Sequence, residues 1–157
     1  MVFKLLLIGK TDDKQLQTLI DAYAKRLKHY IKFELESIPD LKKTKALDEN
    51  QQKRKEGEMI LKKIIPSDEL ILLDENGTMH SSQKFAENIQ KKLNSGKKRV
   101  VFVVGGPYGF SEEVYRRADE KLSLSKMTFS HQMVRLFFVE QLYRAFTILK
   151  GEPYHHQ

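Results

Sequence analysis

The sequence predicts an α/β fold, in which helices flank a mostly parallel sheet. Continuous apolar runs at residues 2–8, 70–73 and 100–104 are typical of strands that are buried on both faces. The segments between them carry apolar residues at helical intervals, as helices with one buried face do. No internal repeat or linker divides the chain, so we expect a single domain over residues 1–157.

The first part of the chain predicts a strand, a helix and a second strand. Residues 2–8 precede Gly9, as in a buried strand followed by its turn. Apolar residues at three- and four-residue intervals predict a helix over residues 13–30. Residues 33–37 alternate between apolar and charged types and end at Pro39, which predicts a strand near an edge of the sheet.

The middle of the chain is dominated by charge. Residues 41–58 carry few apolar side chains, and we expect a mobile basic loop there. Apolar periodicity returns at Met59 and predicts a helix that Pro66 stops. Residues 70–73 predict a central strand, which the polar residues before Gly77 should end.

Two further elements complete the alternation. A helix should begin at an N-cap formed by Ser81 or Ser82, and a strand should follow at residues 100–104. Ligands of such sheets bind beyond the carboxyl ends of the strands. The loops after Leu73 and Val104 are therefore the first places to look for a functional site.

The composition indicates a polyanionic partner. The chain has 28 Lys and Arg against 21 Asp and Glu, a formal net charge of +7 and an isoelectric point near 9.5. Any one basic cluster can equally be a solvated surface, and it is the sum that favours nucleic acid. The clusters include Lys42, Lys43, Lys45, Lys53, Arg54, Lys55, Arg116 and Arg117.

Several classes of protein are excluded or disfavoured. There is no cysteine, which excludes disulfides, zinc-thiolate sites and cysteine nucleophiles and suits a reducing compartment. The apolar start is too short for a secretory signal, and no apolar stretch reaches transmembrane length. We expect a cytoplasmic protein with no membrane association and no metal.

Three glycines within residues 105–109 lie between the last clear strand and a helix. They match neither the dinucleotide-binding fingerprint nor a Walker loop. Ser111 is the expected N-cap of that helix, and Glu112 and Glu113 after it would repel a phosphate at that helix end. The glycines fit close approach to an uncharged group such as adenine or ribose, or a tight turn without any ligand.

Residues 122–128 alternate between apolar and hydroxyl side chains. Such a segment can wrap a flat heterocycle and present backbone donors and acceptors to it. A short final strand explains the alternation equally well.

The helix predicted over residues 131–149 is apolar on almost every face. It must be covered on all sides, and a second copy of the chain would cover its outer face, which predicts a homodimer. Arg135 lies in this apolar field and needs partners, whereas Glu140 and Arg144 can pair with each other. Taken alone, a histidine at a helix start such as His131 is more often a cap or core residue than a catalyst. The aromatic tail would ordinarily fray, and its histidines could be a cloning remnant, but its composition also allows docking.

Several motifs in the right order resemble one family. VGGPYG, LSLSKMTFSHQMVR, VEQLYRAF and GEPYH are similar to the RlmH family, bacterial SPOUT-class methyltransferases that modify N3 of a pseudouridine in 23S ribosomal RNA. KEGEMIL and the VGK-like residues after the first strand extend the resemblance over essentially the whole chain. The resemblance implies S-adenosylmethionine as methyl donor, a C-terminal trefoil knot around it, and a homodimer. Periodicity could not have indicated the knot, since chains are generally unknotted.

The resemblance also implies which residues form the site. Ser130 stands where the family usually has Pro, which implies a less rigid turn, and His156 replaces a usual Lys or Arg, which implies a weaker phosphate contact. The substrate side maps to His131, Arg144, Tyr154 and His155. The cofactor side maps to Leu73, Gly105, Leu124, Ser125, Lys126, Met127, Thr128 and Phe129.

These residues suggest a mechanism. Arg144 would stabilise negative charge on the target base, His155 is a candidate general base, and Tyr154 would stack on or position that base. The substrate is expected to be a loop base splayed from its stack, with phosphates held by residues 42–55 and Arg116. The tail should then fold back beside the glycine turn.

Two rival functions belong to other classes. A nucleotide-binding regulatory protein would need phosphate-directed groups at the glycine turn, which Glu112 and Glu113 oppose. A noncatalytic ribosome-binding factor would explain the basic charge but not the uncharged loop. Whether the substrate is free RNA, the large subunit or the assembled ribosome stays open.

Overall fold

Five strands form one all-parallel sheet in the order β2-β1-β4-β3-β5, which confirms the predicted α/β class. The computed structural model describes residues 1–41 and 44–156. β5 overlaps the start of residues 122–128, which the sequence leaves open as either a ligand-binding loop or a short strand. The other four strands lie where apolar runs or alternation predict them. The strands are β1 (Val2–Ile8), β2 (Lys32–Ile38), β3 (Glu69–Met79), β4 (Arg99–Val104) and β5 (Glu120–Ser123).

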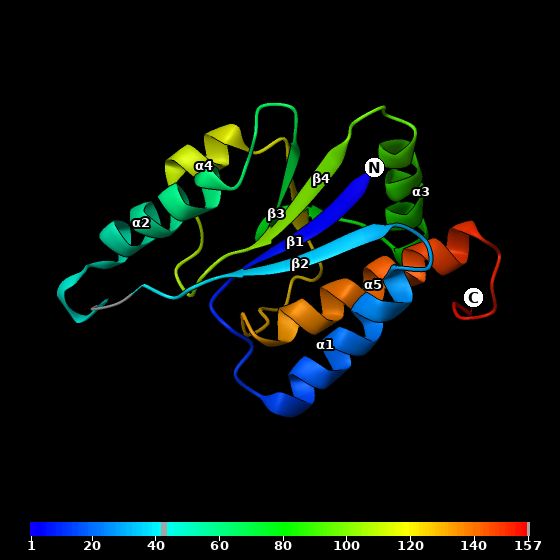
Figure 1. Cartoon of the computed structure of the whole chain (residues 1–157), viewed down its shortest axis with the longest axis horizontal. Coiled ribbons are helices and arrows are strands. Elements are labelled where there is room, and N and C mark those ends of the chain that lie inside the picture. Colours follow the sequence, from blue (N-terminus) through cyan, green and yellow to red (C-terminus); the bar gives the residue numbers. More distant parts are fainter. Residues whose placement is uncertain (42–43, 157) are drawn as a thin grey trace.

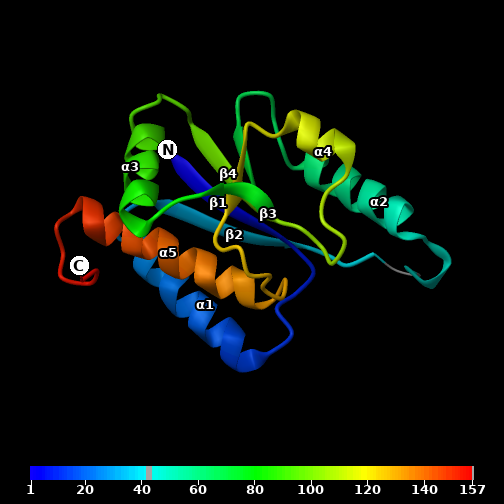
Figure 2. The same ribbon diagram turned by 180° about the vertical axis from the view of Figure 1, so that it is seen from behind.

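Helices cover both faces of the sheet. Figures 1 and 2 show α1, α3 and α5 on one face and α2 and α4 on the other. A short 3₁₀ turn, η1 (Thr44–Ala46), precedes α2. The helices are α1 (Lys14–Leu27), α2 (Glu49–Lys62), α3 (Ser82–Leu93), α4 (Glu112–Arg117) and α5 (Met133–Leu149).

Each face of the sheet has its own hydrophobic core. Because side chains alternate along a strand, Leu5 and Phe102 enter the core under α1, α3 and α5. Leu6 and Val103 enter the second core, under α2 and α4. All four side chains are fully buried, which explains why β1 and β4 read as continuous apolar runs.

The prediction of a loop at residues 41–58 is largely wrong, because most of this segment is helical. α2 begins at Glu49, ten residues before the apolar periodicity returns, because Asp48 and Gln51 form a capping box. Glu56 and Gly57 lie on the buried face of α2, so the helix has no apolar stripe there to detect. Lys42 and Lys43 of the expected basic loop lie outside the described residues.

The central strand β3 is longer than expected. The polar residues after Leu73 do not end it; the strand shifts register against β5 between Leu73 and Thr78 and continues to Met79. A Cβ at Gly77 would lie 2.7 Å from the backbone of Leu122. Gly77 therefore permits a close approach of two strands rather than marking a turn.

Other helix ends lie close to their predicted positions. Ser81 caps α3, its Oγ accepting from the Lys84 N–H at 3.1 Å, and Ser111 caps α4. α1 and α5 each start within two residues of the expected start, and the Asp13 side chain caps α1.

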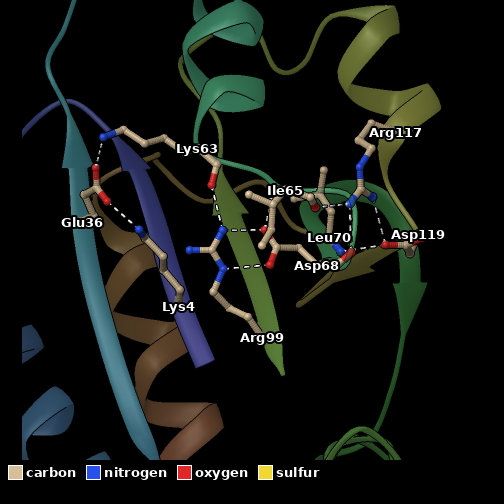
Figure 3. Close-up of polar contacts among 9 residues, drawn as sticks. All are labelled: Lys4, Glu36, Lys63, Ile65, Asp68, Leu70, Arg99, Arg117 and Asp119. Carbon is tan, nitrogen blue, oxygen red and sulfur yellow. Dashed lines mark hydrogen bonds and ion pairs between the residues drawn. The ribbon is translucent and has the colours of Figure 1, made fainter. Parts of the chain in front are cut away.

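Ion pairs at the amino edge of the sheet fix α2 and the strands together (Figure 3). Lys4 and Lys63 both donate to Glu36, at 2.5 and 2.6 Å, and their charge-assisted hydrogen bonds lower the pKa of that carboxyl. Two strands and the end of α2 are thereby joined around one carboxylate.

A second network in Figure 3 surrounds Asp68, which is almost fully buried. Burial alone would raise the pKa of Asp68, but hydrogen bonds from Arg99 and the Ile65 N–H, with the charges of Arg99 and Arg117, hold it below its usual value. Arg117 donates to the carbonyls of Ile65 and Asp68, and to Asp119 at 3.2 Å. This arginine therefore serves the fold.

Candidate functional site

A cavity of about 580 Å³ lies at the carboxyl ends of β4 and β5, beside the part of β3 where its pairing with β5 shifts register. Its walls are Leu73 in β3, Val104 at the end of β4, the glycine loop (residues 105–110) and the loop between β5 and α5 (residues 124–132). This is the edge of the sheet where the sequence predicted a ligand site. The volume is in the range of small-molecule and cofactor sites.

The cavity gathers most of the residues predicted for the cofactor side. His131 and Ser130 also line it, whereas Lys126 is exposed and lies outside the lining. The predicted cofactor residues that line it are Leu73, Gly105, Leu124, Ser125, Met127, Thr128 and Phe129.

The charged side chains of the lining are acidic. Asp74 and Glu75 contribute two carboxylates, and none of the described lining residues is Lys or Arg. Tyr115 donates to Asp74, and Thr128 donates to Glu75 at 3.1 Å. Burial, then the hydrogen bond to Asp74, raises the pKa of Tyr115, which stays a neutral donor. The cavity thus suits a ligand with positive charge and disfavours a phosphate.

Sequence reasoning missed these carboxylates. The sequence pattern predicts only that the polar residues after Leu73 end a strand, whereas Asp74 and Glu75 lie within β3 and line the cavity. Polar residues immediately after a buried parallel strand were the signal that could have identified them.

The glycine loop is a tight turn that also forms a cavity wall. Gly109 has φ +82° and its N–H donates to the Gly106 carbonyl at 3.2 Å. A Cβ at Gly105 would lie 3.0 Å from the ring of Phe110. Glu112 and Glu113 occupy the first turn of α4, as predicted. The predicted turn geometry is confirmed, and the turn also borders a ligand-sized space.

The loop after β5 is held by its own hydroxyl groups. Ser123 Oγ donates to the Ser125 carbonyl at 2.9 Å, and Ser125 Oγ accepts from the Met127 N–H at 3.0 Å. Ser130 Oγ accepts from the Met133 N–H at 3.0 Å and so caps the start of α5. The serine at the position of the family's usual proline therefore supplies a hydrogen bond that proline cannot make.

Arg135 locks the start of α5 to the end of β1. Its side chain is fully buried, and it donates to the carbonyls of Ile8 at 2.7 Å and of Gly9 and His131 at 3.0 Å. It also donates to Thr11 Oγ1 at 3.0 Å. Burial lowers the pKa of this guanidinium, whose partners are neutral oxygens. The partners that a buried Arg135 needs are thus three backbone carbonyls and the Thr11 hydroxyl.

Arg144, Tyr154 and His155 form a tail cluster around Glu140. Glu140 Oε1 accepts from Arg144 at 2.6 Å and from the Tyr154 hydroxyl at 2.8 Å. The Arg144 guanidinium lies 4.8 Å from the centre of the Tyr154 ring. Tyr154 also shares a hydrogen bond of 3.0 Å with Tyr23, so the tail is docked onto α1. The Glu140–Arg144 pair exists as anticipated and organises the tail.

The contact between Arg144 and His155 determines which ring nitrogen of His155 accepts a hydrogen bond and which carries the proton. Arg144 Nη1 lies 3.0 Å from His155 Nδ1, and a guanidinium can only donate. Nδ1 must therefore be the acceptor, which puts the proton of the neutral ring on Nε2. His155 Nε2 and Arg144 Nε are both buried and have no partner within the described residues. In this arrangement the cluster contains two N–H groups without partners, and neither ring nitrogen of His155 is free to accept a proton.

The tail cluster does not reach the cavity of its own chain. α5 starts beside Ile8 at the carboxyl edge and ends beside Phe3 at the amino edge, where Phe146 packs against it. The 17 residues of α5 span about 25 Å. Figures 1 and 2 show the C-terminus at the far end of α5. The expected folding back of Tyr154 and His155 beside the glycine turn is not met within one chain.

Part of α5 remains uncovered. Met133 and Phe137 are 40% and 38% exposed, although α1 and α3 cover the rest of the helix. Phe137 contacts Phe129, with ring centres 4.9 Å apart, and both line a smaller cavity of about 220 Å³ beside the first. An apolar face is therefore available next to the candidate site.

The described residues contain neither a candidate metal centre nor a candidate membrane-spanning helix. No group of three or more His, Asp or Glu side chains there could hold a metal ion. No helix in the same part of the chain has the length and apolar character to span a membrane.

Comparison with known proteins gives full-length matches. The family described as predicted SPOUT methyltransferase matches residues 1–155. A ribosomal RNA large subunit methyltransferase H from Christiangramia forsetii is 71% identical over 157 residues, which is 100% of both chains. Proteins of the same name from Flavobacterium johnsoniae and Parabacteroides distasonis are 68% and 59% identical over the same full length. The resemblance found in the sequence motifs is confirmed.

Proposed function

This chain belongs to the SPOUT methyltransferase family, and we propose that it methylates N3 of a pseudouridine in a loop of 23S ribosomal RNA, with S-adenosylmethionine as donor. The family fold carries a C-terminal trefoil knot, and the relatives' names support a large-subunit RNA substrate. The observation that carries the proposal is the acidic cavity at the carboxyl edge, formed by the segments that resemble the family's donor site.

The chemistry of the cavity fits this donor. S-adenosylmethionine carries a sulfonium and an ammonium group, and Asp74 and Glu75 supply opposite charge. Leu73, Leu124 and Phe129 offer apolar walls for its adenine. When bound, it supplies an electrophilic methyl group. The residues proposed to hold it are Leu73, Gly105, Leu124, Ser125, Lys126, Met127, Thr128 and Phe129, with Lys126 at the outer edge of its loop.

The substrate side is proposed to come from a second copy. One chain holds its cavity and its tail cluster at opposite ends of α5, and the exposed Met133 and Phe137 give that helix an apolar face to bury. In a two-fold dimer with antiparallel α5 helices, the tail of one chain lies near the cavity of the other. The homodimer therefore completes each site.

Within that site, the tail cluster provides charge and donors. Arg144 stabilises the negative charge that develops on the base as N3 passes its proton to solvent water. We place Arg144 and His155 beside the base carbonyls, while Tyr154 stacks on or positions the ring. Glu140 holds both Arg144 and Tyr154 in place. His131 borders the cavity, where an incoming base would pass.

RNA phosphates are proposed to contact α2 and α4. Arg54, Lys55 and Arg116 are exposed on these helices, whereas Lys63 and Arg117 are engaged in the ion pairs of the fold. The substrate can be free RNA, the large subunit or the assembled ribosome, in the bacterial cytoplasm. Salt-dependent binding should follow from these contacts.

The decisive experiment is methylation of ribosomes from a strain that lacks the gene. Incubation with labelled S-adenosylmethionine should modify a single pseudouridine of 23S ribosomal RNA, located by mapping the labelled nucleotide. Calorimetry with S-adenosylmethionine tests the donor separately. Lack of donor binding would contradict the enzyme proposal, and binding without methylation of any ribosomal particle would contradict the assigned substrate.

A further inference from the structure

Two adjacent residues of α2 break the usual rules for a buried helix face. Glu56 is only 3% exposed, and Gly57 beside it is also buried. Gln52 donates to Glu56 Oε2 at 3.3 Å, but Glu56 Oε1 has no partner within the described residues. A buried carboxyl and a mid-helix glycine both lower helix stability. Such local conflicts in one place point to a function.

The position of this pair explains both residues. A Cβ at Gly106 would lie 2.6 Å from Glu56 Oε1, so the carboxyl packs directly against the Cα of the glycine loop. A Cβ at Gly57 would collide with Ser111 Oγ, so the helix backbone packs against the cap of α4. Glu56 and Gly57 thus contact the two ends of the loop that forms one cavity wall.

We propose that Glu56 and Gly57 form a seat for the glycine loop, and that Glu56 is a positioning residue for methyl-donor binding. The inference rests on the proposed function, because the ligand of the cavity is taken to be S-adenosylmethionine. Glu56 does not line the cavity; it acts through Gly106, which does. Displacing the loop toward the cavity would narrow the donor site, and removing its support would loosen it.

The clash at Gly106 provides a reciprocal test. Gly106→Ala should weaken S-adenosylmethionine binding, measured by calorimetry, by about tenfold or more, because its Cβ displaces the loop from the Glu56 carboxyl. Glu56→Ala removes the clashing atoms. The double variant should therefore bind the donor better than Gly106→Ala alone, and close to the affinity of Glu56→Ala. Glu56→Gln, which keeps the shape, should bind as the wild type does.

A matched control lies on the same helix. Glu58 is exposed, so Glu58→Ala should leave donor affinity unchanged. Kinetics distinguish positioning from general destabilisation: Glu56→Ala should raise KM for the donor several-fold, with kcat at saturation changed by less than about twofold. This readout remains if Gly106→Ala fails to fold.

The outcomes separate the seat from the proposed function. Equal weakening by Gly106→Ala in the wild-type and Glu56→Ala backgrounds would overturn the seat, as would a Glu56→Ala variant with an unchanged KM. A wild-type protein that does not bind the donor would overturn the proposed function and, with it, the ligand assigned to the seat.

Discussion

At the scale of single residues, the charges of the candidate site are divided between two places. The cavity contributes carboxylates and the tail cluster contributes a guanidinium, so in the proposed arrangement the donor and the substrate meet side chains of opposite sign. Each charge already has a partner, Tyr115 for Asp74 and Glu140 for Arg144, which fixes its position before any ligand arrives. Preorganised charges of this kind stabilise a transition state without reorganisation.

Replacement of Arg144 by Ala should abolish methyl transfer and leave donor binding intact. Loss of one stabilising charge of this type lowers kcat by roughly 10²–10³-fold. Arg144→Lys should recover little, because Lys cannot donate to Glu140 and His155 in the same planar geometry. The measurements are single-turnover methylation and calorimetry with S-adenosylmethionine. Lys150→Ala, at the exposed end of α5, is the matched control, and undiminished turnover in Arg144→Ala would contradict the assigned role.

The pH dependence of stability should reflect Asp68. Its folded-state pKa is lowered, so its contribution is present above the unfolded value of about 3.9 and is lost as pH falls through the folded value. Asp68→Asn leaves the partly buried Arg99 without its carboxylate, which costs about 1.5–3 kcal/mol at neutral pH. Urea unfolding from pH 7 to pH 3 should show a smaller acid-induced loss in this variant than in the wild type. Equal losses would show that Asp68 is not the group responsible.

At the scale of elements, the start of α5 is the part of the site most firmly fixed to the fold. Arg135 donates to carbonyls at the end of β1, and Gln132 bridges the loop after β1 through the Lys10 carbonyl and the Asp12 N–H. The loop of the donor site ends in this anchored helix. The helix therefore acts as a rigid base for one cavity wall.

Arg135→Met should test that anchor. Methionine fills part of the same buried volume but leaves the carbonyls of Ile8 and Gly9 without donors, each costing about 1–3 kcal/mol. We expect a lower melting temperature and weaker donor binding together, measured by thermal unfolding and calorimetry. Arg26→Met, at an exposed arginine on α1, is the control. A destabilised variant with unchanged donor affinity would separate the anchor from the cavity wall.

The sequence predicted elements well where apolar pattern alone determines them and failed where polar contacts do. β1 and β4 are buried on both faces, so their composition revealed them. The apolar pattern does not reveal the first turns of α2, because the buried face of this helix includes Glu56 and Gly57. These two residues are buried by contact with a loop that is distant in sequence. The donor-side residues came from resemblance to a family. The pairing of Asp74 with Tyr115 required a structure, since only the fold brings these two residues together.

At the scale of the whole molecule, the two groups of proposed site residues lie apart within one chain. Its parallel strands put the cavity at one edge of the sheet, and an antiparallel α5 carries Arg144 and His155 to the other. No sequence pattern could have placed the tail, because the direction of α5 and the docking of Tyr154 on Tyr23 are tertiary features. A two-fold arrangement of two chains reconciles the two halves.

A complementation experiment tests this arrangement directly. Arg144→Ala chains keep an intact cavity, and Gly105→Val chains keep an intact tail but should not hold the donor, since a Cβ there would lie 3.0 Å from Phe110. Each homodimer should be inactive. If each site combines the cavity of one chain with the tail of the other, a mixed dimer has one site of wild-type composition.

Statistical mixing of the two chains makes half of the dimers mixed, so methylation should recover to roughly a quarter of the wild-type rate. The chains are best coexpressed with different tags, so that mixed dimers can also be purified and their rate compared with half of the wild type. Mixing each variant with itself under the same conditions is the control. A purified mixed dimer without activity would mean that the tail serves its own chain and must then cross the length of α5 to act, which its contacts with Glu140 and Tyr23 oppose.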